Sequence, residues 1–329
     1  WVVWDRGQYK KRKLETKEME KMDYYKDNRS RFQIDYTKPI SGSEKRKFSL
    51  HPYVLGVWLG DGKSDGGTIC YSPNDTEHIN RIKDIGYKVS SEWTHKTTGV
   101  KYILWKNLSK KLKKLDLIKN KHIPISYLFS SKENRKELLR GLIDTDGSVD
   151  FDGRVHFVNT NKNLIFGVKV LAESFGYRTC LTEQEPCLST SGIQGTKIVY
   201  SLGFCPSDGE RMGYIKRKNK ICNSIRRKRG ITKIERREKK MGKCIEVKGG
   251  EYLITEYFIP THNSELATIK FPSWLLGNNP DIPFIVASYS GDLAQDFGQK
   301  TRDLMLSEEY REIFKTRLKQ DTKAKGKWM

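Results

Sequence analysis

Two nine-residue segments of the chain share a pattern that constrains the fold more than any other feature. They read VLGVWLGDG (54–62) and LRGLIDTDG (139–147), and each has Gly at its third position and Asp-Gly at its end. Asp61 and Asp146 therefore occupy equivalent places. A single Gly-Asp-Gly is usually a turn. Two aligned copies instead predict a duplicated structure in which both acids have the same role.

Each segment lies at the end of a predicted helix, over 51–62 and 132–147. Small residues at a spacing of four fall on one helix face and let two backbones approach closely. Each predicted helix has such a pair: Gly56 and Gly60 in the first, Gly141 and Thr145 in the second. If the helices pack side by side on these faces, the two acids emerge together at one end.

The pattern between 51 and 205 repeats on a larger scale. It predicts a helix, strands and a helix, followed by a helix, strands, a helix and further strands. This repeat is much longer than the unit of a solenoid. It fits an α+β fold of two similar halves that face each other. Besides the two helices above, we expect strands in 67–72, 99–106, 153–159, 177–184 and 196–204, and helices in 74–86 and 161–177.

The charge is distributed unevenly. The 329 residues, enough for two or three domains, have a net charge of +22, yet 264–329 contains ten Lys/Arg and nine Asp/Glu, so almost all of the excess lies before it. So basic a region attracts a polyanion, and nucleic acid is the commonest one. The alternative is a merely soluble basic protein.

Cysteine usage and hydropathy indicate the compartment. The six Cys form no C-x-x-C pair, which favours reduced thiols over a disulfide framework or a zinc site. No apolar run reaches the length of a membrane span, and no signal peptide is evident. We therefore expect a cytoplasmic protein with no membrane contact. Because the chain begins with Trp1, we expect a fragment or a processed piece.

Two adjacent carboxylates repel each other and need a cation. Oxygen ligands of this kind suit Mg²⁺. A metal held between carboxylates and phosphate oxygens activates water and stabilises the leaving oxygen of an in-line displacement. The sequence therefore predicts that Asp61 and Asp146 hold Mg²⁺ for the hydrolysis of phosphodiester bonds.

The paired segments resemble those of LAGLIDADG homing endonucleases, especially the ones inside inteins, over about 53–220. The resemblance implies a pseudo-two-fold monomer whose two antiparallel β-saddles straddle double-stranded DNA and cut both strands at a long site. The first copy departs from the family pattern at Leu59, where relatives often have an acid. That position is not the metal ligand, so the role of Asp61 is unaffected.

Two lysines are candidates by the same resemblance. KHIP (121–124) is similar to a block between the two motifs, which would place Lys121 near the scissile phosphate, where it stabilises charge. YIKRKNK (214–220) is similar to the segment that provides a second active-site lysine, here Lys218. The alternative is that both are ordinary surface lysines.

The stretch CIEVKGGEYLITEYFIPTHNS (244–264) resembles the end of an intein, where a Hint splicing domain meets its host protein. The side-chain amide of Asn263 would attack its own carbonyl carbon and release the chain at Ser264. His262 would assist by proton transfer, and Ser264 would be the nucleophile that accepts the upstream segment.

Two departures from the intein pattern limit this expectation. The chain begins with Trp1 rather than Cys or Ser, and it lacks an early Thr-x-x-His block. Glu251 and Tyr252 stand where many relatives have Asp-His. We therefore expect that the N-terminal part of the splicing domain is missing and that the chain does not splice by itself. Cleavage at Asn263 is left open.

The segment after Asn263 changes character to a buried-strand pattern (282–290) followed by a helical one, which is typical of α/β proteins. It resembles the ATPase domain of phage terminase large subunits just after the phosphate-binding loop. Ser264 would then be the Ser of a G-K-S/T element that ligates the Mg²⁺ of ATP. The segment lacks the Lys of that element, so we expect no motor activity from it.

Together these patterns predict a site-specific double-strand DNA endonuclease for intein homing, whose target is the intein-less host gene, encoded by a phage and present in a bacterial host. Two alternatives stay open: a nucleic-acid-binding relative without cleavage, and a fragment of an ATP-driven terminase. The predicted segments are a splicing-domain remnant and linker (1–50), the endonuclease (51–220), partial all-β Hint segments (221–263) and an α/β terminase fragment (264–329).

Overall fold

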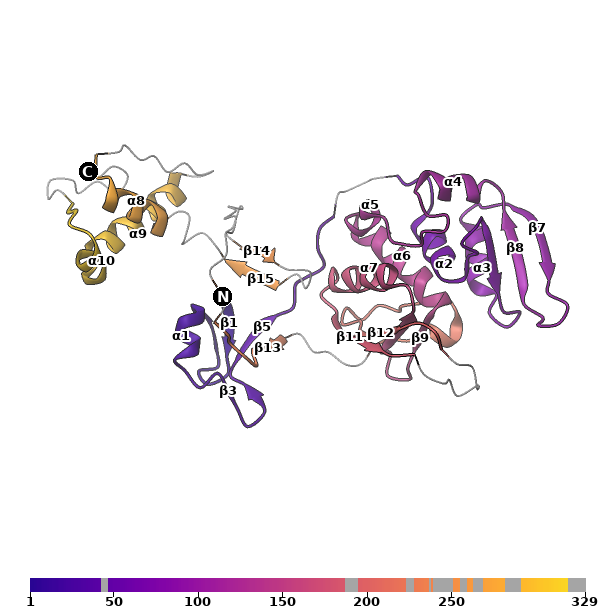
Figure 1. Ribbon diagram of the computed structural model, residues 1–329, viewed down its shortest axis with the longest axis horizontal. Helices are drawn as coiled ribbons and strands as arrows, with labels where there is room; N and C mark the ends of the chain where they lie inside the picture. The colour runs from indigo at the N-terminus through magenta and orange to yellow at the C-terminus, as the bar shows by residue number, and fades with distance from the viewer. Residues whose placement is uncertain are drawn as a thin grey trace. The chain divides into compact units, whose positions relative to one another are not determined.

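The structure is a computed structural model, and the chain divides into two compact units (Figure 1). The larger unit spans Asp35–Arg229, and the smaller comprises Trp1–Ile34, Gly230–Ile254 and Ile259–Met329. The residues that the structure describes are 1–42, 47–186, 195–222, 228–236, 238, 251–254, 259–262, 269–281 and 291–318.

Two helices form the centre of the larger unit: α2 (Pro52–Asp61) and α6 (Lys132–Thr145). The side chain of His51 accepts a hydrogen bond from the backbone N–H of Tyr53, and Pro52 occupies the first turn, so α2 begins where the sequence predicts. All residues from 52 to 59 are buried. Helix α2 is therefore apolar on every side, as expected for a helix enclosed by protein.

Glycines set the distance between α2 and α6. A Cβ atom added to Gly56 would lie 2.3 Å from the carbonyl oxygen of Leu138, and one added to Gly141 would lie 2.3 Å from that of Tyr53. Both contacts are with backbone, which has no room to move. The close packing predicted from the small residues is therefore confirmed, and it requires glycine at both positions.

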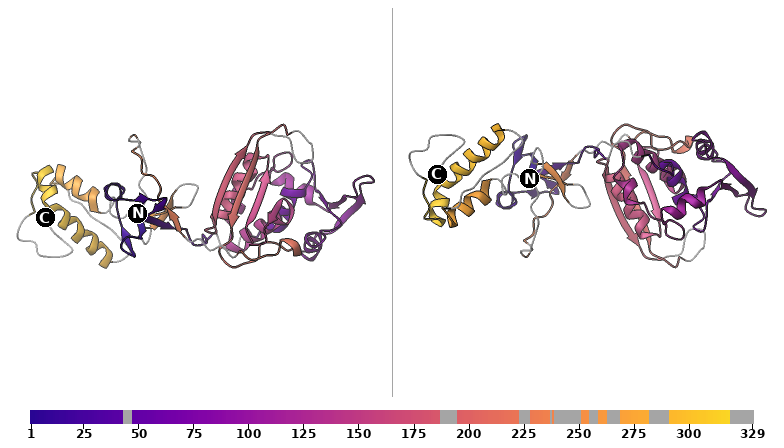
Figure 2. Two further views of the ribbon diagram at one scale, coloured as in Figure 1. Left: turned by 90° about the horizontal axis from the view of Figure 1, so that it is seen from below. Right: turned by 90° about the horizontal axis from the view of Figure 1, so that it is seen from above.

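An antiparallel sheet follows each central helix (Figure 2). The first has the order β6-β8-β7, and the second has the order β11-β12-β10-β9. In the second sheet, buried side chains alternate with more exposed ones along β10 and β12, as expected where one face covers a core. The strands are β6 (Thr68–Tyr71), β7 (Val89–Thr94), β8 (Lys101–Trp105), β9 (Gly147–Val149), β10 (Val155–Asn159), β11 (Arg178–Gln184) and β12 (Val199–Cys205).

Short helices complete the larger unit and join one continuous hydrophobic core around Trp58, Trp105 and Phe157. The sequence predicted α3 and α7 but missed α4, α5, β7 and β9, which are short or mostly exposed. Both sheets nevertheless occur where strands were expected. The two-fold relation between the halves stays a prediction. The remaining helices are α3 (Glu77–Asp84), α4 (Leu108–Lys114), α5 (Ile125–Leu128), α7 (Lys162–Glu173) and the 3₁₀ turn η1 (Lys216–Lys218).

The smaller unit has a modest core of its own, in which Val3, Met19 and Phe32 are buried together. Strand β1 pairs with β2 and β5, and partly buried Ile231, Ile234 and Ile259 pack against the core, so later parts of the chain complete it. The N-terminal elements are β1 (Val2–Asp5), β2 (Lys10–Lys13), α1 (Thr16–Glu20), β3 (Tyr25–Lys26), β4 (Arg29–Ser30) and β5 (Phe32–Asp35), and β13 is Lys228–Gly230.

The C-terminal part contains an antiparallel pair, β14 (Glu251–Ile254) and β15 (Ile259–His262), and three helices, α8 (Phe271–Asn278), α9 (Gly291–Leu306) and α10 (Glu308–Ile313). The strand predicted over 282–290 lies outside the described residues. The Hint and terminase assignments therefore stay predictions. No helix in the described part of the chain combines the length and the apolar character needed to cross a bilayer.

Candidate active site

The structure brings the two predicted metal ligands together at the carbonyl ends of α2 and α6. Asp61 is the last residue of α2, and Asp146 is the C-cap of α6. Gly60 and Thr145 are the residues just before these two acids, and they face each other closely. A Cβ atom added to Gly60 would lie 3.4 Å from the carboxyl carbon of Asp146. The approach of the helices thus determines how near the two carboxyl groups are.

The electrostatics of this pair favour a cation. Burial, and then the charge of Asp146, raise the pKa of Asp61 to about 6. Burial also raises the pKa of Asp146, although Lys121, Asn159 and Lys218 oppose the rise. Each carboxylate is thus destabilised by poor solvation, and Asp61 also by its neighbour's charge, so a positive ion between them would offset both effects.

The donor set fits a hard divalent cation. Within the described ranges, no group of three or more His, Cys, Asp or Glu side chains is placed to hold a metal. Asp61 and Asp146 could supply two carboxylate ligands, with water and phosphate oxygens completing the coordination. Mg²⁺ is commonly bound in this way, through one or two carboxylates and substrate phosphates.

Lys121 lies beside the acidic pair. Its Nζ atom donates to the carbonyl oxygen of Gly60 at 2.9 Å and lies 5.2 Å from the ring centroid of Trp58. Burial lowers the pKa of Lys121, while the charges of Asp146 and Asp61 act in the opposite direction. An ammonium has three N–H donors, so this single hydrogen bond leaves the group able to contact a ligand.

Lys218 has a different environment. Its side chain is buried, and its Nζ atom donates to three backbone carbonyls at the end of α6, those of Ile143 (2.9 Å), Asp144 (2.8 Å) and Thr145 (2.8 Å). All three donors are thus used on carbonyls that would otherwise have no partner in the helix. In this structure Lys218 holds the helix end that precedes Asp146. The sequence did not indicate this, because KRKNK looks solvated.

The two lysines occupy corresponding positions. Gly60 and Thr145 are equivalent in the aligned segments, and their carbonyl oxygens accept from Lys121 and Lys218 respectively. A cation at the carbonyl end of a helix is favourable because partial negative charge accumulates there. Each acid is therefore preceded by a carbonyl that a lysine caps.

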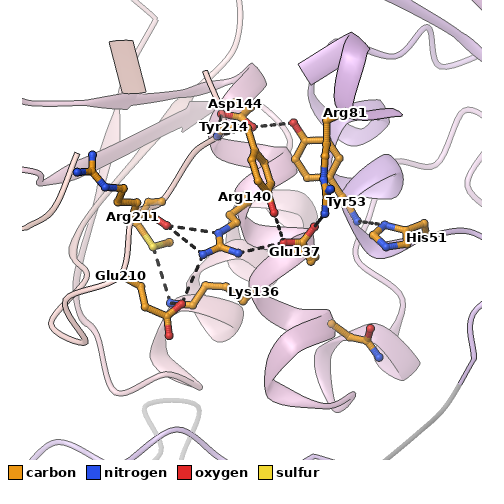
Figure 3. Close-up of polar contacts among 12 residues, drawn as sticks. His51, Tyr53, Arg81, Lys136, Glu137, Arg140, Asp144, Glu210, Arg211 and Tyr214 are labelled. Atoms are coloured by element: carbon orange, nitrogen blue, oxygen red, sulfur yellow. Dashed lines mark hydrogen bonds and ion pairs between the residues drawn. The ribbon is translucent and has the colours of Figure 1, made fainter. Parts of the chain in front are cut away.

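Sequence reasoning missed a buried polar network that anchors the segment leading to Lys218 (Figure 3). The carboxylate of Asp144 accepts from the hydroxyl of Tyr53 at 2.7 Å and from the backbone N–H groups of Tyr214 (3.0 Å) and Ile215 (3.2 Å). Burial raises the pKa of Asp144, and these hydrogen bonds oppose the rise. The network therefore links α2, α6 and the chain that carries Lys218.

Glu137, about two turns before Asp144 on α6, extends the same network (Figure 3). It accepts from the hydroxyl of Tyr214 at 2.7 Å, from Arg140 at 3.0 Å and from Arg81 of α3 at 3.3 Å. The guanidinium groups of Arg81 and Arg140 also lie over the ring of Tyr214, at 4.8 Å and 5.5 Å from its centroid respectively. Tyr214 is thus fixed at its backbone, its hydroxyl and its ring.

A further residue reaches the acidic pair directly. Asn159, the last residue of β10, donates from Nδ2 to Oδ2 of Asp146 at 3.0 Å. It had no motif to mark it, although a polar residue that ends an otherwise alternating strand near a predicted site is a usable signal. Asn159 fixes one oxygen of Asp146 and leaves the other available to a ligand.

Of the three predicted splicing residues, the structure describes only His262. His262 ends β15, where its backbone pairs with Glu251. Asn263 and Ser264 lie outside the described residues. Their roles therefore stay predictions.

Comparison with known proteins gives one family match, to the LAGLIDADG-like domain over residues 133–203, a range that contains Asp146 but not Asp61. The chain is also 36% identical over 232 residues to the replicative DNA helicase DnaB of Mycobacterium intracellulare. That alignment covers 67% of this chain and 36% of the helicase, so the chain spans about a third of that protein.

Several solved structures are similar to part of the chain. Mesophilic variants of the homing endonuclease I-DmoI match with a TM-score of 0.31 and 16% identity, covering 48% of this chain and 89% of theirs. I-DmoI in complex with DNA and Mn matches with a TM-score of 0.31 and 18% identity, covering 47% and 88%. The N-terminal LAGLIDADG domain of DUF199/WhiA matches with a TM-score of 0.30 and 13% identity, covering 48% and 78%.

Proposed function

We propose that the larger unit is a monomeric, Mg²⁺-dependent endonuclease of the LAGLIDADG type that cuts both strands of DNA. The observation that carries the proposal is the pair Asp61 and Asp146, part-buried and adjacent at the ends of two helices packed through glycine. The family match over 133–203 and the strongly basic composition support it. The two sheets would be the surfaces that contact the duplex, as in the predicted saddle arrangement.

The chain's own residues would act as follows. When bound, Mg²⁺ would supply an activated water and stabilise the leaving oxygen. Asp61 and Asp146 would hold it, and Asn159 would keep Asp146 oriented. Lys121, with one hydrogen bond to Gly60, would present its charge to the scissile phosphate.

We also propose that the chain is part of an intein inserted in a terminase large subunit, with His262, Asn263 and Ser264 as the residues of the splice junction. The sequence resemblance at 244–264 is the main support. The match to a stretch of a replicative helicase agrees with it, because an element inserted into unrelated host genes is shared by proteins whose other parts differ.

The test is incubation of the full chain with a DNA fragment of the uninterrupted terminase gene around the codon for Ser264, with and without Mg²⁺. We expect a double-strand cut that requires the metal. Asp61→Asn and Asp146→Asn should bind the fragment with unchanged affinity and cut neither strand. Cleavage by both variants would show that the acidic pair is not the metal site. ATP turnover above background would instead favour the terminase alternative.

A further inference from the structure

A chain of hydrogen bonds joins the surroundings of Asp146 to those of Lys121, and it passes through one residue, Asn161. The side-chain Nδ2 of Asn161 donates to the backbone carbonyl of Lys121 at 2.7 Å. Its backbone N–H donates to Oδ1 of Asn159 at 2.9 Å. Asn159 in turn donates to Asp146. Because the backbone N–H of Asn161 faces the oxygen of the Asn159 amide, the nitrogen of that amide must face the carboxylate.

The third contact of Asn161 holds it in place. It is the N-cap of α7, and its Oδ1 accepts from the backbone N–H of Leu164 at 3.2 Å. With Oδ1 committed to the helix, Nδ2 is directed to Lys121. A cap residue thus aligns a helix, a catalytic acid and a lysine at once.

We propose that Asn161 is a positioning residue for the active site, which sets the backbone at Lys121 and thereby the approach of its ammonium to the carbonyl of Gly60. Lys121 lies forty residues earlier in the chain, between α4 and α5. It is not part of a regular element, so its backbone depends on contacts of this kind. The catalytic consequence rests on the proposed endonuclease function, whereas the geometry does not.

Asn161→Asp isolates this role. Asp is as good an N-cap as Asn, so the bond from Leu164 and the bond to Asn159 are kept. The donor to Lys121 is replaced by an acceptor oxygen, which repels the carbonyl that it faces. The matched control is Asn163→Asp, which makes the same charge change two residues away on an exposed position of α7.

The first measurement needs no cleavage. Amine labelling of the full chain, read by mass spectrometry at Lys121, should be several-fold faster in Asn161→Asp than in the wild type or in Asn163→Asp. The melting temperature should stay near that of the control, because the cap is retained. Unchanged labelling of Lys121 would overturn the proposal, whether or not the protein cuts DNA.

The second measurement asks whether Asn161 acts through Lys121. Asn161→Asp should lower the cleavage rate about 10- to 100-fold, as loss of an outer partner of a catalytic group typically does, while the dissociation constant for DNA stays unchanged. In a Lys121→Met background the same substitution should have no further effect. An equal loss in both backgrounds would refute the positioning role. Absence of cleavage in the wild type would refute the proposed function, and the labelling result would still decide this inference.

Discussion

Replacing Asp61 by Asn is expected to stabilise the metal-free protein while it abolishes cleavage. Burial and the charge of Asp146 raise the pKa of Asp61 from 3.8 to about 6. The folded state therefore binds this proton more tightly than the unfolded state does. The stability that comes from this proton is fully present below about pH 4 and is lost as the pH rises to about 6. Above that pH, Asp61 causes no further change of stability with pH.

The magnitude follows from the two pKa values. A tenfold difference in proton affinity corresponds to about 1.4 kcal/mol, so the ionised Asp61 lowers the free energy of unfolding by about 3 kcal/mol at neutral pH. Asn has the shape of the neutral acid and avoids this cost. For a unit of this size, 1 kcal/mol shifts the melting temperature by about 2–4 °C. Asp61→Asn should therefore melt about 6–12 °C higher at pH 7.5 without metal.

Scanning calorimetry of the full chain, which can resolve the transition of the larger unit, is the appropriate assay. In EDTA, the variant should be more stable at pH 7.5 and nearly equal to the wild type at pH 4. Mg²⁺ should raise the melting temperature of the wild type alone. The control is Asp65→Asn, which removes an exposed acid nearby. The reasoning is refuted if the advantage is absent at pH 7.5 or persists unchanged at pH 4.

Three further outcomes follow from the same geometry. Gly56→Ala should lower the free energy of unfolding by about 3 kcal/mol, because the added Cβ meets backbone atoms. In the control Gly167→Ala, the added Cβ meets the side chain of Ile123. Its free energy of unfolding, measured like the first by urea denaturation, should differ from that of the wild type by no more than about 1 kcal/mol. Lys218→Met should lower the free energy of unfolding by about 3 kcal/mol or more, because it leaves three carbonyls at the end of α6 unpaired, two of them buried. Lys121→Met should cost less stability and instead reduce cleavage, and equal stability losses would contradict this assignment. The Mg²⁺ concentration for half-maximal cleavage should rise about tenfold from pH 7.5 to pH 5, as protons compete at Asp61; no change would argue against carboxylate ligation.

The sequence was sufficient to predict the central helices and their contact. The glycines of the aligned segments and the Asp-Gly ends are local signals, and the geometry they require, a backbone approach with no side chain between, has few other solutions. Strands β10 and β12 of the second sheet were predictable for a similar reason, since buried and more exposed residues alternate along them. Strand β7, which reads VSSEWT and is mostly exposed, gave no such pattern.

The supporting residues of the site could not be found in this way. Asp144 lies on a helix whose polar positions look solvated, and its partners Tyr214 and Ile215 are about seventy residues later in the sequence. Lys218 is in a run of basic residues, which gives no sign that one ammonium is buried. Burial of a polar group depends on which distant segment covers it, and a single sequence contains no direct record of that pairing.

The arrangement of charge explains why the fold supports the site so heavily. Two acids at the carbonyl ends of helices meet partial negative charge from the backbone as well as from each other. Lys218 gives all three of its donors to carbonyls at the end of α6, while Lys121 gives one to a carbonyl at the end of α2. These carbonyls thus have cationic partners, but the carboxylates stay poorly solvated, as the raised pKa of Asp61 indicates. A site built in this way is kept together by glycine packing and buried hydrogen bonds, and it retains its unfavourable charge for a divalent cation to offset.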